Sequence, residues 1–419
     1  MLRHLTIIFT FLMTMSLSAQ TLHQRMISDP RVGAGIYCPY NFTNEVQTYS
    51  PPLKGYKPFY ISHFGRHGSR YFSGYHNMQP TVDCFKAAKA QGLLTSRGDS
   101  LYSAIMAIYQ EHQSMLGELA PLGGREHRGI AKRMYAREKT VFSSRERTRV
   151  RSVSSIVTRC LVSMANFTEE LTSYAPDLNI EYLAGKRYNE SYISVKTSEK
   201  FMSEFLPIID SLKRAHFHPE TLFALYFTEP QKMLESVDPY AVEMGLYYFW
   251  AICFDLDFMS LDLTPLIPME ELAACAAVGN TYRYGKVSMS KEFGKYPSPK
   301  GEALLKDFLA KAQDAVKEDS DVAADFRFIH DSGFVPLCTL LGLDGFPAFE
   351  VRRAHKEWNA ADVVPMCANL QVIFYKNKGN DVIVKVLVNE KESSINGLTP
   401  VEGKYYRWDD LCDKLNSLK

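Results

Sequence analysis

The sequence predicts an α/β fold, with a mainly parallel sheet flanked by helices and a mainly helical segment inserted into it. Strand-like and helix-like segments alternate in the first and last parts of the chain, as is typical of a parallel sheet covered on both faces. Between them, from about residue 174 to residue 297, apolar residues recur mainly at helical spacing. A chain of 419 residues with 46% hydrophobic residues is long enough to hold such a core and its insertion.

The first part of the core is expected over residues 20–173. The clearest helical pattern there is that of Leu101, Ile105 and Ile108, which recur on one helix face. The expected elements, in chain order, are a buried strand over 60–64, a helix around 101–108, a helix over 125–137, a short strand over 148–152 and a helix over 157–171. Ligands of parallel sheets bind beyond the carboxyl ends of the strands, so the residues that follow these strands are the first candidates for a site.

The second part of the core is expected over residues 298–419. A helix is predicted from Ser298-Pro299, because serine is a favourable N-cap residue and proline is favourable at the first helical position. A strand and a hairpin complete the prediction, the strand over 326–329 and the hairpin over 371–375 and 382–388.

Residues 1–19 are predicted to be a secretory signal peptide. Arg3 precedes a mostly apolar run over residues 5–17, and the small residues Ser18 and Ala19 follow it. The run is short for a membrane span, so we expect cleavage near Ala19 and a secreted or periplasmic location. An uncleaved membrane anchor is the alternative, whereas the mature chain is expected to carry no stable membrane span.

Charge and cysteine content limit the expected partners. The formal net charge of +1 gives no reason to expect nucleic acid or an acidic membrane as a partner. The eight cysteines allow 105 disulfide pairings, and the sequence does not choose among them. No C-x-x-C pair or clustered Cys/His spacing indicates a metal, so we expect neither a metal nor another cofactor. The oligomeric state stays open.

The most informative motif is Arg66-His67-Gly68-Ser69-Arg70, which follows the first predicted strand. Guanidinium groups match phosphate oxygens in a bidentate way, and glycine lets the backbone approach a ligand closely. A neutral imidazole held in line with a phosphorus atom can attack it and form a covalent phosphoenzyme. The motif therefore indicates a phosphate site in which His67 is the nucleophile and Arg66 and Arg70 grip the phosphate. A solvated basic turn is the structural alternative.

Two later segments extend the pattern. Arg159 opens the helix behind the second predicted strand, and His330-Asp331 follows the strand over 326–329. The His-Asp pair alone would more often be a turn cap. Together and in this order, the three segments resemble the histidine phosphatase superfamily, in its branch of acid phosphatases, phytases and multiple inositol polyphosphate phosphatases. The segments that carry this resemblance are Arg66 to Arg70, Val150 to Ser152 with Arg159 to Phe167, and Phe326 to Asp331 with Leu340 to Leu343.

The resemblance implies a phosphoglycerate-mutase-like core, a helical cap that forms one wall of the cleft, and a small-molecule phosphate ester as substrate. It implies that Arg159 is the third phosphate clamp and that His330 donates to a phosphoryl oxygen. It also implies that Asp331 is the general acid that protonates the leaving alkoxide. The sequence departs from the commonest phytase pattern at Tyr71-Phe72, which leaves the substrate preference open.

Some residue assignments keep their alternatives. Arg147, in a basic run upstream, imitates the same motif and competes with Arg159; we favour Arg159 because its flanking strand and helix fit the family pattern better. Lys186 and Arg187 could reach a polyanionic substrate at the cleft rim, although ordinary surface charges are the more common role. His63 receives no role from its spacing.

The sequence thus predicts an exported, metal-independent phosphomonoesterase that works through a phosphohistidine on His67. Inositol polyphosphates or phytate are the expected substrates, and a broad-specificity acid phosphatase is the first alternative. A phosphate-ligand binding protein without chemistry is disfavoured because both histidines, Asp331 and three matching arginines occur together. A mutase is disfavoured by the export signal and the long insertion.

Overall fold

The computed structural model describes residues 21–40, 49–188 and 198–418. The predicted signal peptide, residues 1–19, lies outside the described residues. Within them, no helix is long and apolar enough to cross a membrane.

Eight strands of the described chain form one mixed sheet, in the spatial order β3, β2, β4, β1, β5, β6, β7, with β8 also paired to β6. The first four strands in this order are parallel, and β5 to β8 extend the sheet in antiparallel fashion. The strand bounds are β1 Lys57–Arg66, β2 Arg149–Ser154, β3 Asn179–Ala184, β4 Val322–Ile329, β5 Asn369–Lys376, β6 Val382–Val388, β7 Lys391–Glu392 and β8 Tyr405–Arg407. The predicted α/β class is confirmed, and so is the late hairpin, which is β5 and β6.

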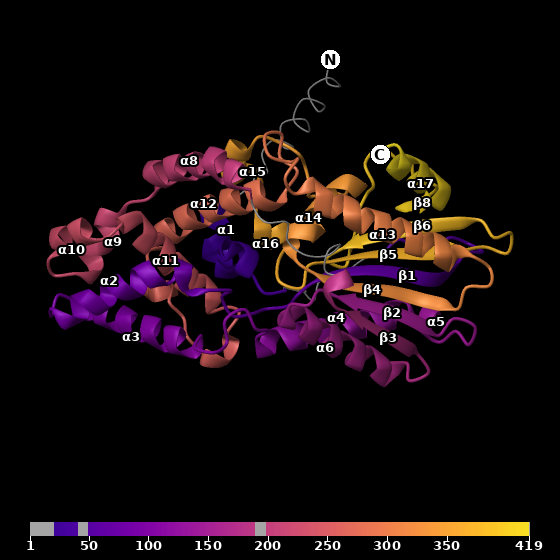
Figure 1. Cartoon of the computed structure of the whole chain (residues 1–419), viewed down its shortest axis with the longest axis horizontal. Coiled ribbons are helices and arrows are strands. Elements are labelled where there is room, and N and C mark those ends of the chain that lie inside the picture. The colour runs from indigo at the N-terminus through magenta and orange to yellow at the C-terminus, as the bar shows by residue number, and fades with distance from the viewer. Residues whose placement is uncertain (1–20, 41–48, 189–197, 419) are drawn as a thin grey trace, which may run out of the picture.

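Helices cover both faces of the sheet (Figure 1). Successive residues of a strand point to opposite faces, so Ile61 of β1 belongs to one hydrophobic cluster and Tyr60 and Phe64 to another. Helices α4 and α6 pack on the first face, and α13, α14 and α17 on the second. The bounds are α4 Pro121–Arg137, α5 Lys139–Phe142, α6 Thr158–Tyr174, α13 Ser298–Val316, α14 Asp331–Leu341 and α17 Trp408–Asn416. Ser298 is the first residue of α13 rather than its N-cap, and its hydroxyl donates to Glu302.

A helical lobe lies beside the sheet, on the left of Figure 1. It contains α8 to α12, and α1, α2 and α3 from earlier in the chain pack against these helices. The bounds are α1 Leu22–Ser28, α2 Gln79–Ala90, α3 Ser96–Glu111, α8 Glu199–His216, α9 Pro219–Tyr226, α10 Pro230–Ser236, α11 Pro239–Ile252 and α12 Met269–Val287. Within the segment 174–297, β3 joins the sheet as its edge strand.

Short helices connect these elements. Their bounds are η1 Pro30–Gly33, η2 Gly35–Tyr37, η3 Tyr75–Asn77, η4 Asp257–Met259, η5 Thr264–Leu266, η6 Val351–Arg353, α15 Ala354–Glu357 and α16 Ala360–Val363.

The register of the parallel strands brings three chain segments to one edge of the sheet. Arg66 at the end of β1 is aligned with Ile329 at the end of β4, and Ser154 at the end of β2 is aligned with Phe328. The residues that follow these strands, His67 and His330 among them, therefore meet at the carboxyl edge, where ligands of such sheets bind.

Candidate active site

His67 is held by its backbone between two elements. Its N–H donates to the carbonyl oxygen of Ile329 at the end of β4 (3.1 Å), and its own carbonyl accepts the N–H of Cys367 (3.0 Å). The imidazole Nδ1 lies 3.0 Å from the carbonyl oxygen of Gly68. A carbonyl oxygen only accepts, so Nδ1 carries the ring proton and Nε2 keeps its lone pair. Burial, and then the charge of Arg159, hold the pKa of His67 well below its usual range.

The loop after His67 packs directly on the first turn of α4. A Cβ on Gly68 would lie 2.6 Å from the Cα of Gly123, and a Cβ on Gly123 would lie 2.4 Å from the carbonyl oxygen of Ser69. Both positions therefore require glycine, which has no Cβ. Of the Gly123-Gly124 pair in the sequence, Gly123 makes this contact, whereas Gly124 faces Asn166.

Glu126, one turn later on α4, fastens the same loop. It accepts hydrogen bonds from the N–H of Ser69 (2.8 Å), from the Ser69 hydroxyl (2.9 Å) and from the N–H of Tyr40 (2.7 Å). Burial raises the pKa of Glu126, and these hydrogen bonds act against that rise. Sequence reasoning missed Glu126, because nothing near it in the chain distinguishes it from the other charged residues of its helix.

Three arginines, Arg66, Arg70 and Arg159, lie close enough to His67 for their charges to lower its pKa. Arg66 is 1% exposed and donates to the carbonyl of Val364 (2.7 Å). The guanidinium of Arg70 lies 5.4 Å from the ring centre of Tyr37. Burial lowers the pKa of Arg66 and of Arg159 to about 10, and repulsion from Arg70 is the next cause for both. Buried guanidinium groups that repel one another form a site that an anion stabilises.

His330 completes this cluster from the end of β4. Its ring centre lies 5.5 Å from that of His67. The Arg159 Nη2 lies 3.4 Å from Nδ1 of His330, and the Ser155 hydroxyl lies 3.1 Å from Nε2. Burial, and then Arg159, hold the pKa of His330 well below its usual value, so the ring is neutral. Cys160, predicted to be a small buried hydrophobe, is buried with its Sγ 3.6 Å from Nε2 of His330.

Asp331 is the first residue of α14, where the helix dipole favours a negative charge. Its Oδ1 accepts the N–H of Ser332 (2.8 Å). Its Oδ2 accepts a hydrogen bond from the guanidinium of Arg283, on α12, and lies 3.9 Å from Nη2 of Arg66. Sequence reasoning missed Arg283, which lies in the helical lobe 48 residues before its partner.

Arg147 lies at the amino ends of the parallel strands, opposite to the carboxyl ends where His67 and His330 lie. Its guanidinium donates to the carbonyl oxygens of Ala315 (2.7 Å), Lys317 (3.0 Å) and Val322 (3.1 Å), the last being the first residue of β4. Arg159 therefore lies with the other candidate phosphate residues, and Arg147 does not.

The remaining candidates lie apart from the cluster. Lys186 and Arg187 are exposed and follow the carboxyl end of the edge strand β3, and neither is among the described residues that line the cleft. His63 is buried on β1, with its ring stacked 5.1 Å from that of Phe167.

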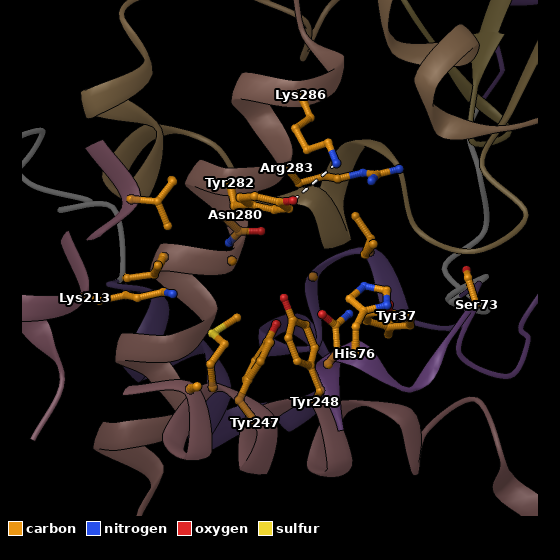
Figure 2. Close-up of a pocket in the computed structure, with 18 of the residues that line it drawn as sticks. Tyr37, Ser73, His76, Lys213, Tyr247, Tyr248, Asn280, Tyr282, Arg283 and Lys286 are labelled. Atoms are coloured by element: carbon orange, nitrogen blue, oxygen red, sulfur yellow. Dashed lines mark hydrogen bonds between the residues drawn. The ribbon is translucent and has the colours of Figure 1, made fainter. Parts of the chain in front are cut away.

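A cleft of about 450 Å³ lies in the helical lobe, lined mainly by α8, α11, α12 and the segments 35–37 and 73–77, and it meets the cluster at Arg70 (Figure 2). Arg70, in the loop after His67, lines the cleft, and so does Arg283, which donates to Asp331. Figure 2 shows Arg283 and Lys286 on one side of the cavity and Tyr247 and Tyr248 on the other. Tyr282 lies on the side of Arg283 and Lys286 and accepts a hydrogen bond from the Lys286 Nζ (3.2 Å), so cations and tyrosine rings together line the cleft.

Another cation lies beside Arg283 and Lys286. Burial, and then the charges of Arg283 and Lys286, lower the pKa of Lys300, at the start of α13, to about 8. Lys213 lines the far end of the cleft. Among the residues that the structure describes, no group of three or more His, Cys, Asp or Glu side chains could hold a metal ion.

Comparisons with known proteins identify the fold. No family model and no curated protein matches the sequence. Among solved structures, the multiple inositol polyphosphate phosphatase of Bifidobacterium longum in complex with phosphate is similar, with a TM-score of 0.78 at 19% identity over 92% of this chain and 97% of that one. Its complex with inositol hexasulfate gives a TM-score of 0.76 at 19% identity, covering 91% of this chain and 97% of that one. The chain has the fold of the histidine acid phosphatases.

A phytase has the same fold. The enzyme from D. castellii is similar with a TM-score of 0.64 at 13% identity, over 92% of this chain and 84% of that one. The predicted resemblance to the histidine acid phosphatase branch is thus confirmed for the fold. The structure brings His67, Arg66, Arg70, Arg159 and His330 to one edge of that fold.

Proposed function

We propose that the protein is a phosphomonoester hydrolase that acts on inositol polyphosphates through a phosphohistidine on His67. The observation that carries the proposal is the state of this imidazole, which is neutral, bonded at Nδ1 to the Gly68 carbonyl and close to the charges of the buried Arg66 and Arg70 and the half-buried Arg159. A phosphoryl group in the cluster would neutralise part of the positive charge, and its phosphorus would face the unprotonated Nε2.

The reaction has two steps. In the first, Nε2 of His67 attacks the phosphorus and the ester P–O bond breaks, while Asp331 transfers a proton to the leaving oxygen. In the second, water attacks the phosphorus of the phosphohistidine, Asp331 accepts a proton from it, and phosphate leaves. Arg66, Arg70 and Arg159 stabilise the charge on the phosphoryl oxygens in both steps, with His330 as a further donor.

The cleft supports a polyphosphorylated substrate. Its volume and its tyrosine rings suit a substituted six-membered ring, and Arg283, Lys286 and Lys213 offer charge to phosphate groups that are not being transferred. The similar solved structures include a complex with inositol hexasulfate. Lys186 and Arg187 stay candidates for the outer rim. Export through the predicted signal peptide belongs to the same proposal.

Phosphate release tests the proposal directly. The protein is assayed with inositol hexakisphosphate, glycerol 2-phosphate and nitrophenyl phosphate between about pH 3 and about pH 8. We expect release from all three, with the highest kcat/KM for inositol hexakisphosphate. Equal kcat/KM for all three would instead identify a broad-specificity acid phosphatase, and no release would identify a binding protein.

His67→Ala tests the nucleophile. This variant should lose turnover while binding of inorganic phosphate persists, because the three arginines remain. His216→Ala, at the end of α8, is the matched control and should behave as the parent does. Labelled substrate quenched early should leave acid-labile, base-stable label on the parent protein only. If His67→Ala keeps a tenth of the parent rate, the nucleophile is another residue.

A further inference from the structure

The ion pair between Arg283 and Asp331 joins the helical lobe to the edge of the sheet. Arg283 is on α12, and Asp331 is the first residue of α14. Their side chains are 22% and 5% exposed, so little water screens the interaction. The carboxyl group that should give up a proton is thus held by a cation.

This contact opposes the proposed role of Asp331. A cation in contact with a carboxyl group favours its ionised form, and an ionised carboxylate has no proton to give. The elements packed on α14 are β1, α12 and α13. The charged and titratable groups around the pair, element by element, are Arg66 at the end of β1 with His67 and Arg70 in the loop after it, Tyr282, Arg283 and Lys286 on α12, Lys300 on α13, and His330 before α14, with Tyr37 also close to Arg283. All of these groups are neutral or cationic, so Arg283 is the contact through which the protonation of Asp331 can change.

Arg283 is also able to leave Asp331. It lines the cleft, and its Nε–H has no hydrogen-bond partner although it is buried. Lys286 and Lys300 add positive charge beside it. Burial, and then repulsion from Arg66, lower the pKa of Arg283 to about 9. A phosphate group in the cleft would offer Arg283 a second anion and a partner for its unused donor.

We propose that Arg283 is a positioning residue that holds Asp331 until a second phosphate group of the substrate draws the guanidinium into the cleft. The inference rests on the proposed function and adds selection for polyphosphorylated substrates to it. On a monophosphate, Arg283 stays on Asp331, and proton transfer to the leaving oxygen is impaired. On an inositol polyphosphate, a phosphate that is not being transferred takes the guanidinium, and Asp331 takes up a proton from solvent.

The movement of Arg283 does not change which bonds form and break in the catalytic cycle or where the protons go. The protonated Asp331 gives its proton to the ester oxygen as the P–O bond breaks and the bond between phosphorus and Nε2 of His67 forms. The attacking water returns a proton to Asp331 when the phosphohistidine is hydrolysed. Arg283 makes and breaks no covalent bond, and only its hydrogen-bond partner changes.

The test compares Arg283→Gln with the parent on two substrates that both release a basic alkoxide. Glycerol 2-phosphate has one phosphate group, and inositol hexakisphosphate has several. For glycerol 2-phosphate, the alkaline limb of the plot of kcat against pH should move to higher pH by about one unit. At a given pH on this limb, kcat of the variant should then be about tenfold higher than that of the parent. For inositol hexakisphosphate, the limb should stay in place while KM rises, since the variant loses a cation of the cleft.

Two further variants separate this role from a general loss of charge. Lys286→Gln removes a neighbouring cation of the same helix that does not contact Asp331; KM for inositol hexakisphosphate should rise, and the limb for glycerol 2-phosphate should not move. Arg283→Lys keeps the charge and should restore the parent limb. Melting temperatures establish that each variant is folded.

The outcomes are distinct. A folded Arg283→Gln whose limb for glycerol 2-phosphate stays where the parent has it, or which slows both substrates alike, overturns the inference and leaves the proposed function standing. A parent protein that hydrolyses neither substrate overturns the proposed function and this inference with it.

Discussion

Arg159 donates from its Nη2 to Nδ1 of His330 across 3.4 Å, which joins two residues 171 positions apart in the chain. Since a guanidinium only donates, Nδ1 of His330 accepts, and the neutral ring carries its proton on Nε2, toward the Ser155 hydroxyl. One contact thus orients the guanidinium of Arg159 and fixes the tautomer of His330. The single N–H of the ring faces Ser155, so a phosphoryl oxygen that binds the cluster would compete for donors that are already paired.

Arg159 and Arg147 form a matched pair for testing the phosphate clamp. Arg159→Gln should weaken the binding of inorganic phosphate by about 1.5–3 kcal/mol, the usual worth of a hydrogen bond to a charged group. Arg147→Gln should leave phosphate binding intact and lower the melting temperature, because three backbone carbonyls lose their donor. Calorimetric titration with phosphate and thermal unfolding separate the two effects. The reverse result would restore Arg147 as the third clamp.

Glu126 should matter for activity although it does not contact the substrate. In Glu126→Gln the amide nitrogen cannot accept, so one donor among the N–H groups of Ser69 and Tyr40 and the Ser69 hydroxyl loses its partner, at a cost of about 1–3 kcal/mol. The loop that carries His67 then loosens, and kcat should fall about tenfold or more. Glu169→Gln, an exposed residue of α6, is the control. A variant with the parent kcat and melting temperature would remove Glu126 from this role.

The sequence predicted the parts of the site that lie next to strands. His67 and His330 follow apolar runs, and the geometry of parallel sheets then brings both to one edge. The sequence distinguished Arg159 from Arg147 as the third phosphate residue less clearly, because each lies close to a predicted strand. Only the tertiary fold shows that Arg147 lies at the amino ends of the parallel strands. Glu126 could not be found at all, because its partners lie 57 and 86 residues away.

The helical lobe was the least predictable part. Its helical spacing was visible, but the packing of α2 and α3 on its later helices depends on contacts between distant segments. Arg283 illustrates the difficulty, because on a helix an arginine is as a rule a surface residue. Only the fold turns it toward Asp331.

Two buried histidines should make the fold sensitive to acid. Burial lowers the pKa of His63 and of His127 to about 3, whereas a histidine in the unfolded chain titrates near pH 6.5. Between these values the unfolded chain binds a proton that the folded chain does not. The stability is therefore complete above about pH 6.5 and should fall by about 1.4 kcal/mol per histidine for each pH unit below it.

Urea unfolding at a series of pH values measures this slope. His63→Leu removes one titrating ring from the contact with Phe167, so its slope should be smaller than that of the parent by about 1.4 kcal/mol per pH unit. The comparison uses slopes, so a packing defect that lowers stability equally at every pH does not affect it. Parallel pH profiles for parent and variant would mean that His63 is protonated in the folded chain.

Asp331→Asn tests the general acid through the leaving group. An inositol alkoxide needs a proton as it leaves, whereas nitrophenolate hardly does. The variant should therefore slow release from inositol phosphates far more than from nitrophenyl phosphate, by a gap within the roughly 10² to 10⁴ that a positioned acid supplies. Phosphate release from both substrates, measured at the pH optimum of the parent, gives this gap.

The ion pair with Arg283 makes a control necessary, because Asp331→Asn also leaves a buried guanidinium without its carboxylate. The double variant Asp331→Asn with Arg283→Gln removes that uncompensated charge. If Asp331 is the acid, the double variant keeps the gap between the two leaving groups while it regains stability. If both substrates are slowed equally in a folded Asp331→Asn, and the double variant restores both, the aspartate acts only by balancing Arg283. The proton must then come from another group at the edge of the cleft.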